Sequence, residues 1–198
     1  SVELATGIFL AVMAAVVVWG ISVYNGLVQR RSRIANAFAQ IDVQLKRRYD
    51  LIPNLVEVAK KYLAHEAGTL EAVARARGAA VTAAGNVRMR PTDAGAVQAL
   101  ATAEQELGGS IGRLFALAES YPDLKADATM RSLGEELTST ENRIGFARQA
   151  YNDEVMEYNV AASQFPGAVA ARVFGFLPAA MLESTRNAQE REAPRVAF

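Results

Sequence analysis

The chain has 198 residues, and its 21 cationic and 21 anionic side chains give a formal net charge of zero. That balance argues against a nucleic-acid-binding protein, which normally carries a basic face. The absence of cysteine excludes disulfides, zinc–thiolate sites and cysteine nucleophiles. Only six prolines occur, while Ala, Leu, Glu and Arg are plentiful, and this mixture favours helix over sheet.

The first predicted element is a membrane-spanning helix over residues 4–24 (LATGIFLAVMAAVVVWGISVY). No charged residue lies between Glu3 and Arg30. A helix over this stretch rises about 31 Å, close to the roughly 30 Å hydrocarbon core of a bilayer. A signal peptide is the alternative, but its apolar region is normally shorter and follows basic residues rather than an acidic one.

The charges on either side of the apolar stretch predict its orientation. Arg30, Arg31 and Arg33 follow the stretch, whereas only Glu3 precedes it. The positive-inside rule then places residues 1–3 outside and the C-terminal body in the cytoplasm, as a single-pass protein. The three arginines either contact anionic lipid headgroups or only set the topology.

A long helical pattern follows the apolar stretch. Apolar residues recur at steps of four and three over residues 34–84, which predicts one helix that stops at Gly85. Pro53 lies inside this pattern, although proline costs about 3 kcal/mol in a helix interior. Because the spacing passes Pro53 without a reset, we expect the helix to continue and to bend there. The alternative is two helices that meet at this point, with Asp50 as the N-cap.

Two further long helices and a short one are predicted next. After a loop, Thr92 or Asp93 is a suitable N-cap for a second helix whose apolar stripe covers 97–121. A third stripe covers 130–165, and a short apolar helix over 168–175 is placed to cover an open end of the bundle. Sustained spacing near 3.5 residues indicates helices packed side by side at shallow angles.

These elements predict an all-α protein. A transmembrane helix leads into an antiparallel bundle of three long helices plus the short C-terminal helix, together covering residues 25–175. We expect residues 176–198 to form a tail in which 183–193 is a charged, solvated linker. Apolar side chains in and just before this tail gain little unless something covers them. They form a candidate docking segment: Phe174, Phe176, Val196 and Phe198.

Five stretches carry a recognisable family pattern. They are YNGLV (24–28), IDVQLKRRYDLIPNLVEVAKKYLAHE (41–66), ELTSTENRIGFARQAYNDEVMEYN (136–159), FPGAVAARVFGF (165–176) and PRVAF (194–198). In this order they resemble the LemA family of bacterial membrane proteins. The resemblance implies a transmembrane helix in the bacterial inner membrane and a cytoplasm-facing antiparallel bundle whose long first helix carries the LIPNL motif. It implies no established catalytic activity, so no catalytic residue is carried over.

The residues themselves also indicate no reaction centre. His65 is the only histidine, which excludes a di-iron site built on two Glu-x-x-His units and the usual zinc hydrolase motifs. A Ser-His-Asp triad would need His65 as its base, but His65 lies beside Glu66 in a predicted helix, where a histidine is far more often a surface or structural residue. We therefore expect a protein that is not an enzyme, with no catalytic residues, no metal site and no cofactor.

Polar side chains on or beside the apolar stripes are the more informative candidates. They need partners, because burying an unpaired ion costs several kcal/mol, and we expect Arg47 or Arg48 to meet carboxylates of the third helix. Such residues either fix the helix register, as in coiled coils, or form a polar groove that binds a helix or peptide. The candidate cluster is Arg47, Arg48, Asp50, Asn54, Glu141, Asn142, Asn152 and Asp153.

The expected function is that of a non-enzymatic scaffold that self-associates at the cytoplasmic face of the membrane. The alternative is an adaptor that binds and regulates another membrane protein, such as a protease or a signalling component. The expected partners are the lipid bilayer and further copies of the chain, with another membrane protein as the alternative. Nucleic acid is not expected as a partner.

Overall fold

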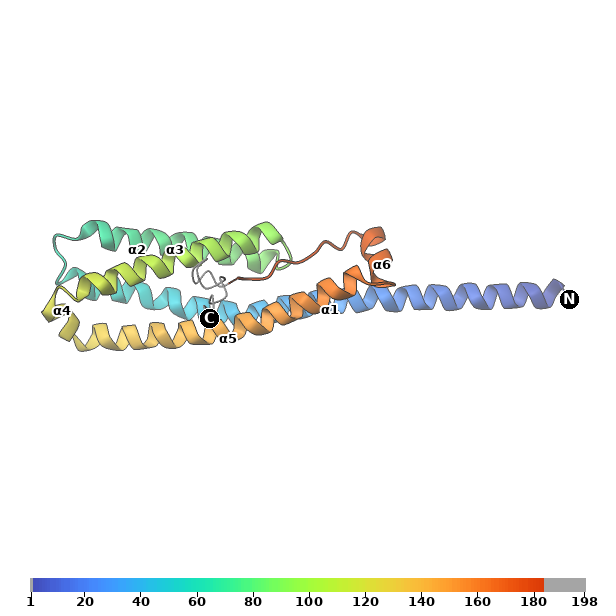
Figure 1. The fold of residues 1–198 in the computed structure, drawn as a ribbon, viewed down its shortest axis with the longest axis horizontal. Coiled ribbons are helices and arrows are strands. Elements are labelled where there is room, and N and C mark those ends of the chain that lie inside the picture. The colour runs from blue at the N-terminus through green and yellow to red at the C-terminus, as the bar shows by residue number, and fades with distance from the viewer. Residues whose placement is uncertain (1, 184–198) are drawn as a thin grey trace, which may run out of the picture.

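The computed structural model describes residues 2–183, and that range contains six helices and no strand. The predicted all-α class is therefore confirmed. Most of α1 beyond its apolar part lies beside α2 and α5, while the rest of it leaves the bundle as a free rod (Figure 1). The helices are α1 (Val2–Lys60), α2 (Ala67–Met89), α3 (Ala94–Ala118), α4 (Pro122–Ala126), α5 (Ala128–Ser163) and α6 (Gly167–Phe174).

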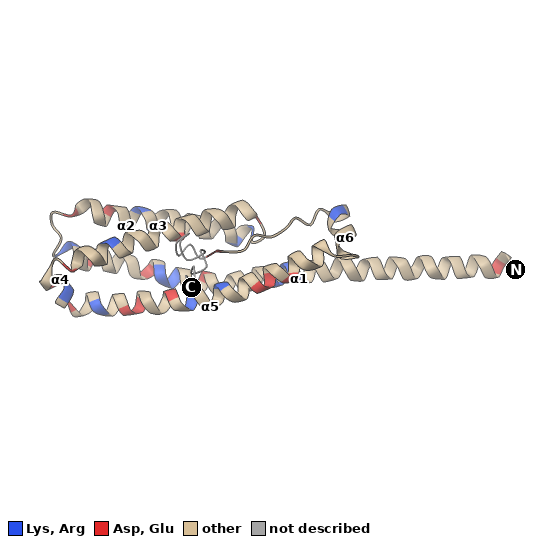
Figure 2. Cartoon of the chain, viewed as in Figure 1, with Lys and Arg blue, Asp and Glu red and all other residues tan. Residues whose placement is uncertain are grey.

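The free rod is the part of α1 that matches a membrane span. Of the helices described, α1 alone is long and apolar enough to cross a bilayer, with a mean hydropathy of 2.4 over its most apolar 18-residue window. None of that window is buried in the fold, whereas the core helix of a soluble protein would be mostly covered. Figure 2 shows no charged residue along the rod between Glu3 and the bundle. Because α1 is helical from Val2 to Lys60, the rod and the first helix of the bundle are one unbroken helix.

The α1 helix continues through Pro53, so the alternative of two helices meeting there is wrong. Proline has no backbone N–H, which leaves the carbonyl of Tyr49, four residues earlier, without its helical donor. The Nε of Arg77 on α2 donates a hydrogen bond of 2.7 Å to this carbonyl. The helix tolerates Pro53 because a neighbouring helix supplies the missing donor. A bend of the helix axis at this residue stays a prediction.

One continuous helix over 34–84 was expected, and this expectation is wrong. The first helix ends at Lys60, residues 61–66 form a turn, and the chain reverses into α2. The bundle therefore contains four long helical segments instead of three. The turn contains neither glycine nor proline. Leu63 within the turn and Leu70 after it are both buried, and their separation of seven residues is a helical spacing. The apolar pattern consequently crosses the turn without a visible interruption.

Contacts with distant residues hold this turn in place. The hydroxyl of Tyr62 donates to the carboxylate of Asp127 at 2.9 Å. The hydroxyl of Tyr121 donates to the carboxylate of Glu66 at 3.3 Å. In each bond the two residues are more than fifty positions apart along the chain. Local sequence patterns therefore do not predict these bonds.

Two aspartates cap the helices that follow. Asp93 accepts a hydrogen bond from the backbone N–H of Ala96 at 2.9 Å, which confirms it as the N-cap of α3. Asp127 caps α5 in the same way, through the N–H of Met130 at 3.0 Å. This backbone bond, followed by the bond from Tyr62, lowers the pKa of the Asp127 carboxyl below its ordinary value.

The predicted stop of the helical pattern at Gly85 is also wrong, since α2 runs on to Met89. Val87 is fully buried and holds the last turn against the core. Arg88 forms two hydrogen bonds with the carboxylate of Asp42 on α1, from Nε at 2.9 Å and from a terminal nitrogen at 2.8 Å. Tertiary contacts therefore extend the helix beyond its glycine.

The C-terminal end of α5 departs from the predicted stripe. Phe165 was expected in the apolar seam, but 77% of it is exposed, because α5 ends at Ser163 and the chain turns into α6. The observed α6 agrees with the short helix expected over 168–175, and Gly175 ends it with a left-handed φ of 71°. This helix packs on both α5 and α1 where the free rod begins (Figure 1).

Candidate functional site

A buried polar network joins α1 to α3. A terminal nitrogen of Arg48 lies 2.8 Å from a carboxylate oxygen of Glu104, and these side chains are only 11% and 17% exposed. The hydroxyl of Tyr49 donates to the other carboxylate oxygen at 2.5 Å. Burial, and then the negative charge of Glu104, raise the pKa of Tyr49 far above its ordinary value. The tyrosine therefore stays a hydrogen-bond donor at any physiological pH.

Tyr49 is the residue on which this network converges. Its hydroxyl bonds to Glu104 on α3, and its carbonyl accepts from Arg77 on α2. A single residue of α1 is thus bonded to both helices of the α2–α3 hairpin. Shifting either helix by one turn would break these bonds, so the network fixes the helix register.

A groove of about 970 Å³ separates α3 from α5. The two helices pack chiefly on α2 and α1 respectively, and Ile41 and Leu45 of α1 lie at the bottom of the groove. Glycines are frequent along both walls. They are Gly108, Gly109 and Gly112 on α3, and Gly134 and Gly145 on α5.

Two of these glycines face open space. A Cβ added at Gly112 or at Gly145 would meet no atom within 4 Å outside its own helix backbone and chain neighbours. Glycine inside a helix costs roughly 0.5–1 kcal/mol relative to alanine, and packing within the chain does not require it here. Phe146 lines the same groove and is 77% exposed. The groove thus offers a helix backbone that another helix can approach closely.

The structure divides the predicted polar cluster among different environments. Arg47 lies 3.5 Å from Glu136 of α5, in an exposed ion pair. Arg48 belongs to the buried network and also lines the groove, together with Glu141 and Asn142. The remaining residues of the cluster lie elsewhere: Asp50, Asn54 and Asp153 are exposed and outside the groove lining, and Asn152 contacts the segment after α6.

Residues 176–183, here called the C-terminal strap, run back along the bundle after α6 (Figure 1). Asn152 forms two hydrogen bonds with the backbone of Leu182, donating to its carbonyl at 3.2 Å and accepting from its N–H at 2.8 Å. Asn159 forms the same pair of bonds with Ala179, both at 2.9 Å. The strap is therefore part of the folded bundle, although the sequence assigns it to the tail.

A tyrosine precedes each of these asparagines. Tyr151 donates to the carbonyl of Ala180 at 3.3 Å, and Tyr158 to that of Leu177 at 2.8 Å. Burial raises the pKa of Tyr151 to about 12. Within α5 the dipeptide Tyr-Asn thus occurs twice, seven residues apart, which places both copies on the same face two helical turns apart. The sequence analysis did not recognise that this repeat could bind the backbone of an extended segment.

Replacing both Asn152 and Asn159 by alanine is expected to release the strap without unfolding the bundle. Each replacement removes two hydrogen bonds to backbone groups, and intramolecular hydrogen bonds contribute about 1 kcal/mol each. Hydrogen exchange of the full chain should show faster exchange at residues 176–183, with α1 to α5 unchanged. Asn142, which makes no such backbone pair within the described residues, provides the matched alanine control. Unchanged protection of the strap in the double variant would contradict this assignment.

The predicted docking segment and basic residues meet where α1 leaves the bundle. Phe176 is buried against the ring of Tyr24, with ring centres 5.5 Å apart, and the guanidinium of Arg31 lies 5.3 Å from the Phe176 ring centre. Phe174 is 60% exposed. Arg30 bonds to the carbonyl of Gly26, and Arg33 pairs loosely with Glu157. Val196 and Phe198 lie outside the described residues.

These features define a class of protein: an all-α bundle continuous with an apolar helix long enough to span a bilayer. Among residues 2–183, no three His, Cys, Asp or Glu side chains come together as metal ligands would. The chain belongs to the LemA family, whose model matches residues 37–198.

Magnetosome proteins are among the relatives of this chain. The magnetosome protein MamQ of Magnetospirillum gryphiswaldense is 27% identical over 168 residues, covering 77% of this chain and 62% of the relative. Magnetosome proteins MamQ 1 and MamQ 2 of Paramagnetospirillum magneticum are 26% identical over the same shares. This chain therefore spans 62% of the length of these relatives.

Proposed function

We propose that this chain is a non-enzymatic scaffold, held in a bacterial inner membrane by residues 4–24, that self-associates through the groove between α3 and α5. In this proposal the bundle lies on the cytoplasmic side, because Arg30, Arg31 and Arg33 follow the apolar stretch. The observation that carries the proposal is the open, glycine-lined groove.

The unbroken α1 helix determines which partners can reach this groove. A flexible linker between the membrane span and the bundle would let the bundle tilt, but α1 is helical from Val2 to Lys60. Figure 1 shows the rod in line with the long axis of the bundle, so in this proposal the bundle stands upright on the membrane. Its groove runs along the same direction, between helices that are parallel to α1. A helix that fills it must also stand upright on the membrane, as the helices of a second anchored copy do.

Charge and anchoring favour contact between copies. The chain has a formal net charge of zero, so two copies do not repel each other as strongly charged proteins do. Anchoring in one membrane also raises the effective concentration of one copy near another. The exposed ring of Phe146 and the bare backbone at Gly112 and Gly145 provide apolar contact area and close approach in the same groove.

Replacing Gly112 and Gly145 by leucine is expected to dissociate the assembly while stabilising the monomer. Leucine is a better helix former than glycine, so each change should raise the free energy of unfolding by about 0.5–1 kcal/mol. The added side chains would block the approach of another helix. Light scattering after size-exclusion chromatography of the detergent-solubilised chain would measure the assembly.

Gly78→Leu is the matched control. Gly78 lies on the exposed face of α2, outside the groove, and a Cβ there would also meet nothing within 4 Å. This variant should gain similar stability and keep the parental assembly size. An assembly that survives both groove substitutions would contradict self-association through the groove. A monomeric parent that co-purifies with a different membrane protein would instead support the adaptor function.

A further inference from the structure

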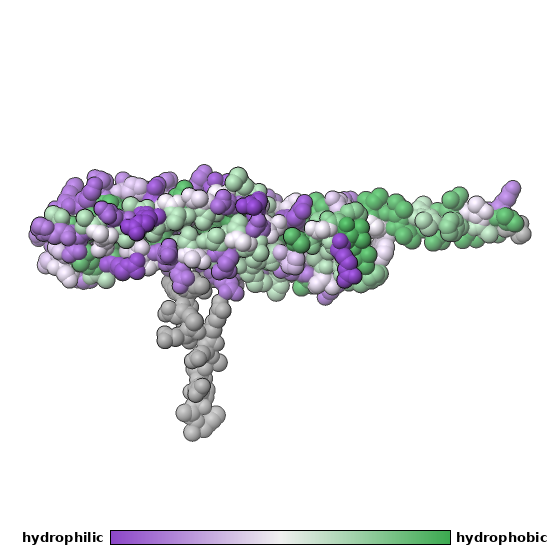
Figure 3. Space-filling model, turned by 90° about the horizontal axis from the view of Figure 1, so that it is seen from above, coloured by the Kyte–Doolittle hydropathy of each residue, from purple (hydrophilic) through white to green (hydrophobic). Residues whose placement is uncertain are grey.

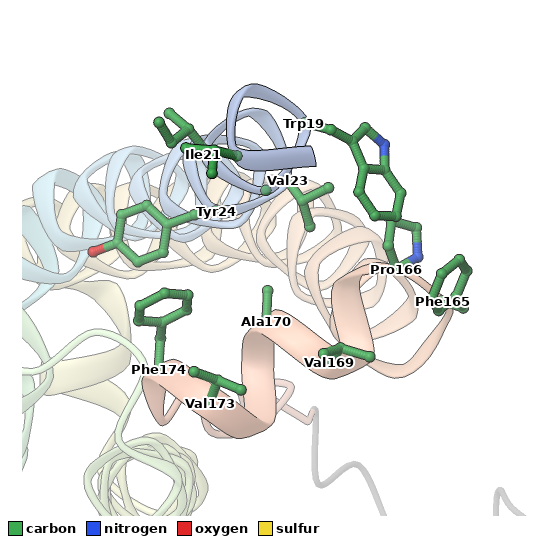
Figure 4. Close-up of a pocket in the computed structure, with 12 residues that line it drawn as sticks. Trp19, Ile21, Val23, Tyr24, Phe165, Pro166, Val169, Ala170, Val173 and Phe174 are labelled. Atoms are coloured by element: carbon green, nitrogen blue, oxygen red, sulfur yellow. The ribbon is translucent and has the colours of Figure 1, made fainter. Parts of the chain in front are cut away.

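A second hollow lies between α6 and the exposed rod of α1. Its volume is about 470 Å³, and none of the twelve residues that line it is charged. Figure 4 shows Ala170 and Phe174 of α6 pointing toward Tyr24 and Val23 of α1 across this hollow. Gly20 of α1 also lines it, and a Cβ there would meet nothing within 4 Å. We call this hollow the juxtamembrane pocket.

Ring contacts fix the level of α6 along α1. The ring centre of Phe165 lies 5.9 Å from that of Trp19, and the ring centre of Phe174 lies 4.8 Å from that of Tyr24. With a rise of about 1.5 Å per residue, Trp19 lies roughly 7.5 Å deeper than Tyr24 along the apolar stretch 4–24. If that stretch spans a bilayer, the turn before α6 must lie at the same depth as Trp19.

The exposed apolar side chains of this tip suit lipid better than water. Phe165, Val169, Val173 and Phe174 are 77%, 57%, 70% and 60% exposed. No charged residue occurs over 158–171. In Figure 3 the hydrophobic surface of the rod continues onto the adjoining end of the bundle. A cluster of this size on a soluble surface normally marks an interaction site.

Two basic side chains lie next to the apolar tip. Arg172 is the single cation on α6, marked in Figure 2. Arg31 reaches over the ring of Phe176, just beyond the apolar residues. Long cationic side chains at such a boundary extend their charge toward lipid phosphates while their stems stay in apolar surroundings.

We propose that the tip formed by residues 165–174 inserts into the cytoplasmic leaflet beside the anchor, and that a phospholipid acyl chain fills the juxtamembrane pocket. This inference rests on the proposed membrane anchor. The insertion depth of roughly 7.5 Å agrees with the 5–10 Å at which interfacial helices bury their apolar face. The bundle is then attached to the bilayer at two elements, which prevents it from rotating about the axis of α1 and keeps the α3–α5 groove in a fixed lateral direction.

Tryptophan quenching in lipid vesicles tests the insertion. Trp19 is the only tryptophan, so the full-length parent reports the anchor itself. In a Trp19→Phe background, Val173→Trp reports the tip and Phe146→Trp reports the bundle. The vesicles contain phosphatidylcholine and phosphatidylglycerol with bromine near the headgroup end of the acyl chains. We expect clear quenching at position 173, which lies near the level of Tyr24 because the neighbouring Phe174 contacts that ring, and no quenching at position 146.

The outcomes separate the two proposals. An unquenched Trp19 in the parent would overturn the membrane anchor. A quenched Trp19 together with an unquenched tryptophan at position 173 would overturn the insertion of the tip alone.

Filling the pocket tests for the acyl chain. Native mass spectrometry of the full chain in mild detergent with added phosphatidylglycerol should show one retained lipid that Ala170→Phe abolishes, because the new ring occupies the pocket. Leu177→Phe, a change at an exposed residue outside the pocket lining, should leave retention unchanged. Equal lipid retention in the Ala170→Phe variant and the parent would overturn the occupancy of the pocket.

Discussion

Replacing Glu104 by alanine is expected to lower the free energy of unfolding by about 3 kcal/mol, because it breaks a buried ion pair from one side. The change leaves the guanidinium of Arg48, which is 11% exposed, without its carboxylate. It also removes the acceptor that lies 2.5 Å from the hydroxyl of Tyr49. Urea unfolding of the detergent-solubilised full chain, followed by circular dichroism, would measure the loss.

Two further variants test whether the buried charge is the cause. The double change Arg48→Met with Glu104→Leu removes both charges and should recover most of the loss, since an apolar pair of similar volume often replaces a buried ion pair without cost. Arg47→Ala breaks the exposed pair with Glu136 and should cost less than about 1 kcal/mol. A double variant as unstable as Glu104→Ala would show that packing, and not the unpaired charge, explains the loss.

The apolar spacing predicted which segments form long helices. It did not predict where the chain reverses between two of them. The stripes over 97–121 and 130–165 correspond to α3 and α5 because each runs between clear stop signals. The turn at 61–66 has no such signal and depends on bonds from Tyr62 and Tyr121. Sequence patterns therefore predict which faces are buried, but not a reversal that tertiary contacts impose.

The candidate polar cluster shows a different limit. Arg48 and Asp50 are two residues apart, which places them on different faces of one helix. The first is in the buried network and the second is exposed. A residue beside an apolar stripe can point toward the core or toward solvent. The sequence therefore identified the region of the polar cluster but not which of its residues are buried. The C-terminal strap was missed for another reason: Asn152 and Asn159 bind backbone groups, which leave no pattern of side chains in the bound segment.

Arg77→Met is expected to cost about 2 kcal/mol in the parent chain and less than about 1 kcal/mol in a Pro53→Ala background. In the parent, Arg77 donates to the Tyr49 carbonyl that has no helical partner, and hydrogen bonds from charged groups contribute about 1.5–3 kcal/mol. Alanine at position 53 restores the backbone N–H, so the carbonyl regains its own donor and depends less on Arg77.

The four proteins of this double-mutant cycle, compared by urea unfolding, should give a coupling energy of about 1–2 kcal/mol between positions 53 and 77, because the two residues share one acceptor. Equal costs of Arg77→Met in both backgrounds would mean that the arginine acts only through packing or charge. A positive coupling would explain why a long helix keeps a proline: the carbonyl of Tyr49 that Pro53 releases becomes the point where α2 is fastened to α1. The same proline would then contribute to the register of the bundle, since Pro53 is the proline inside α1 and frees the carbonyl of Tyr49 at that position.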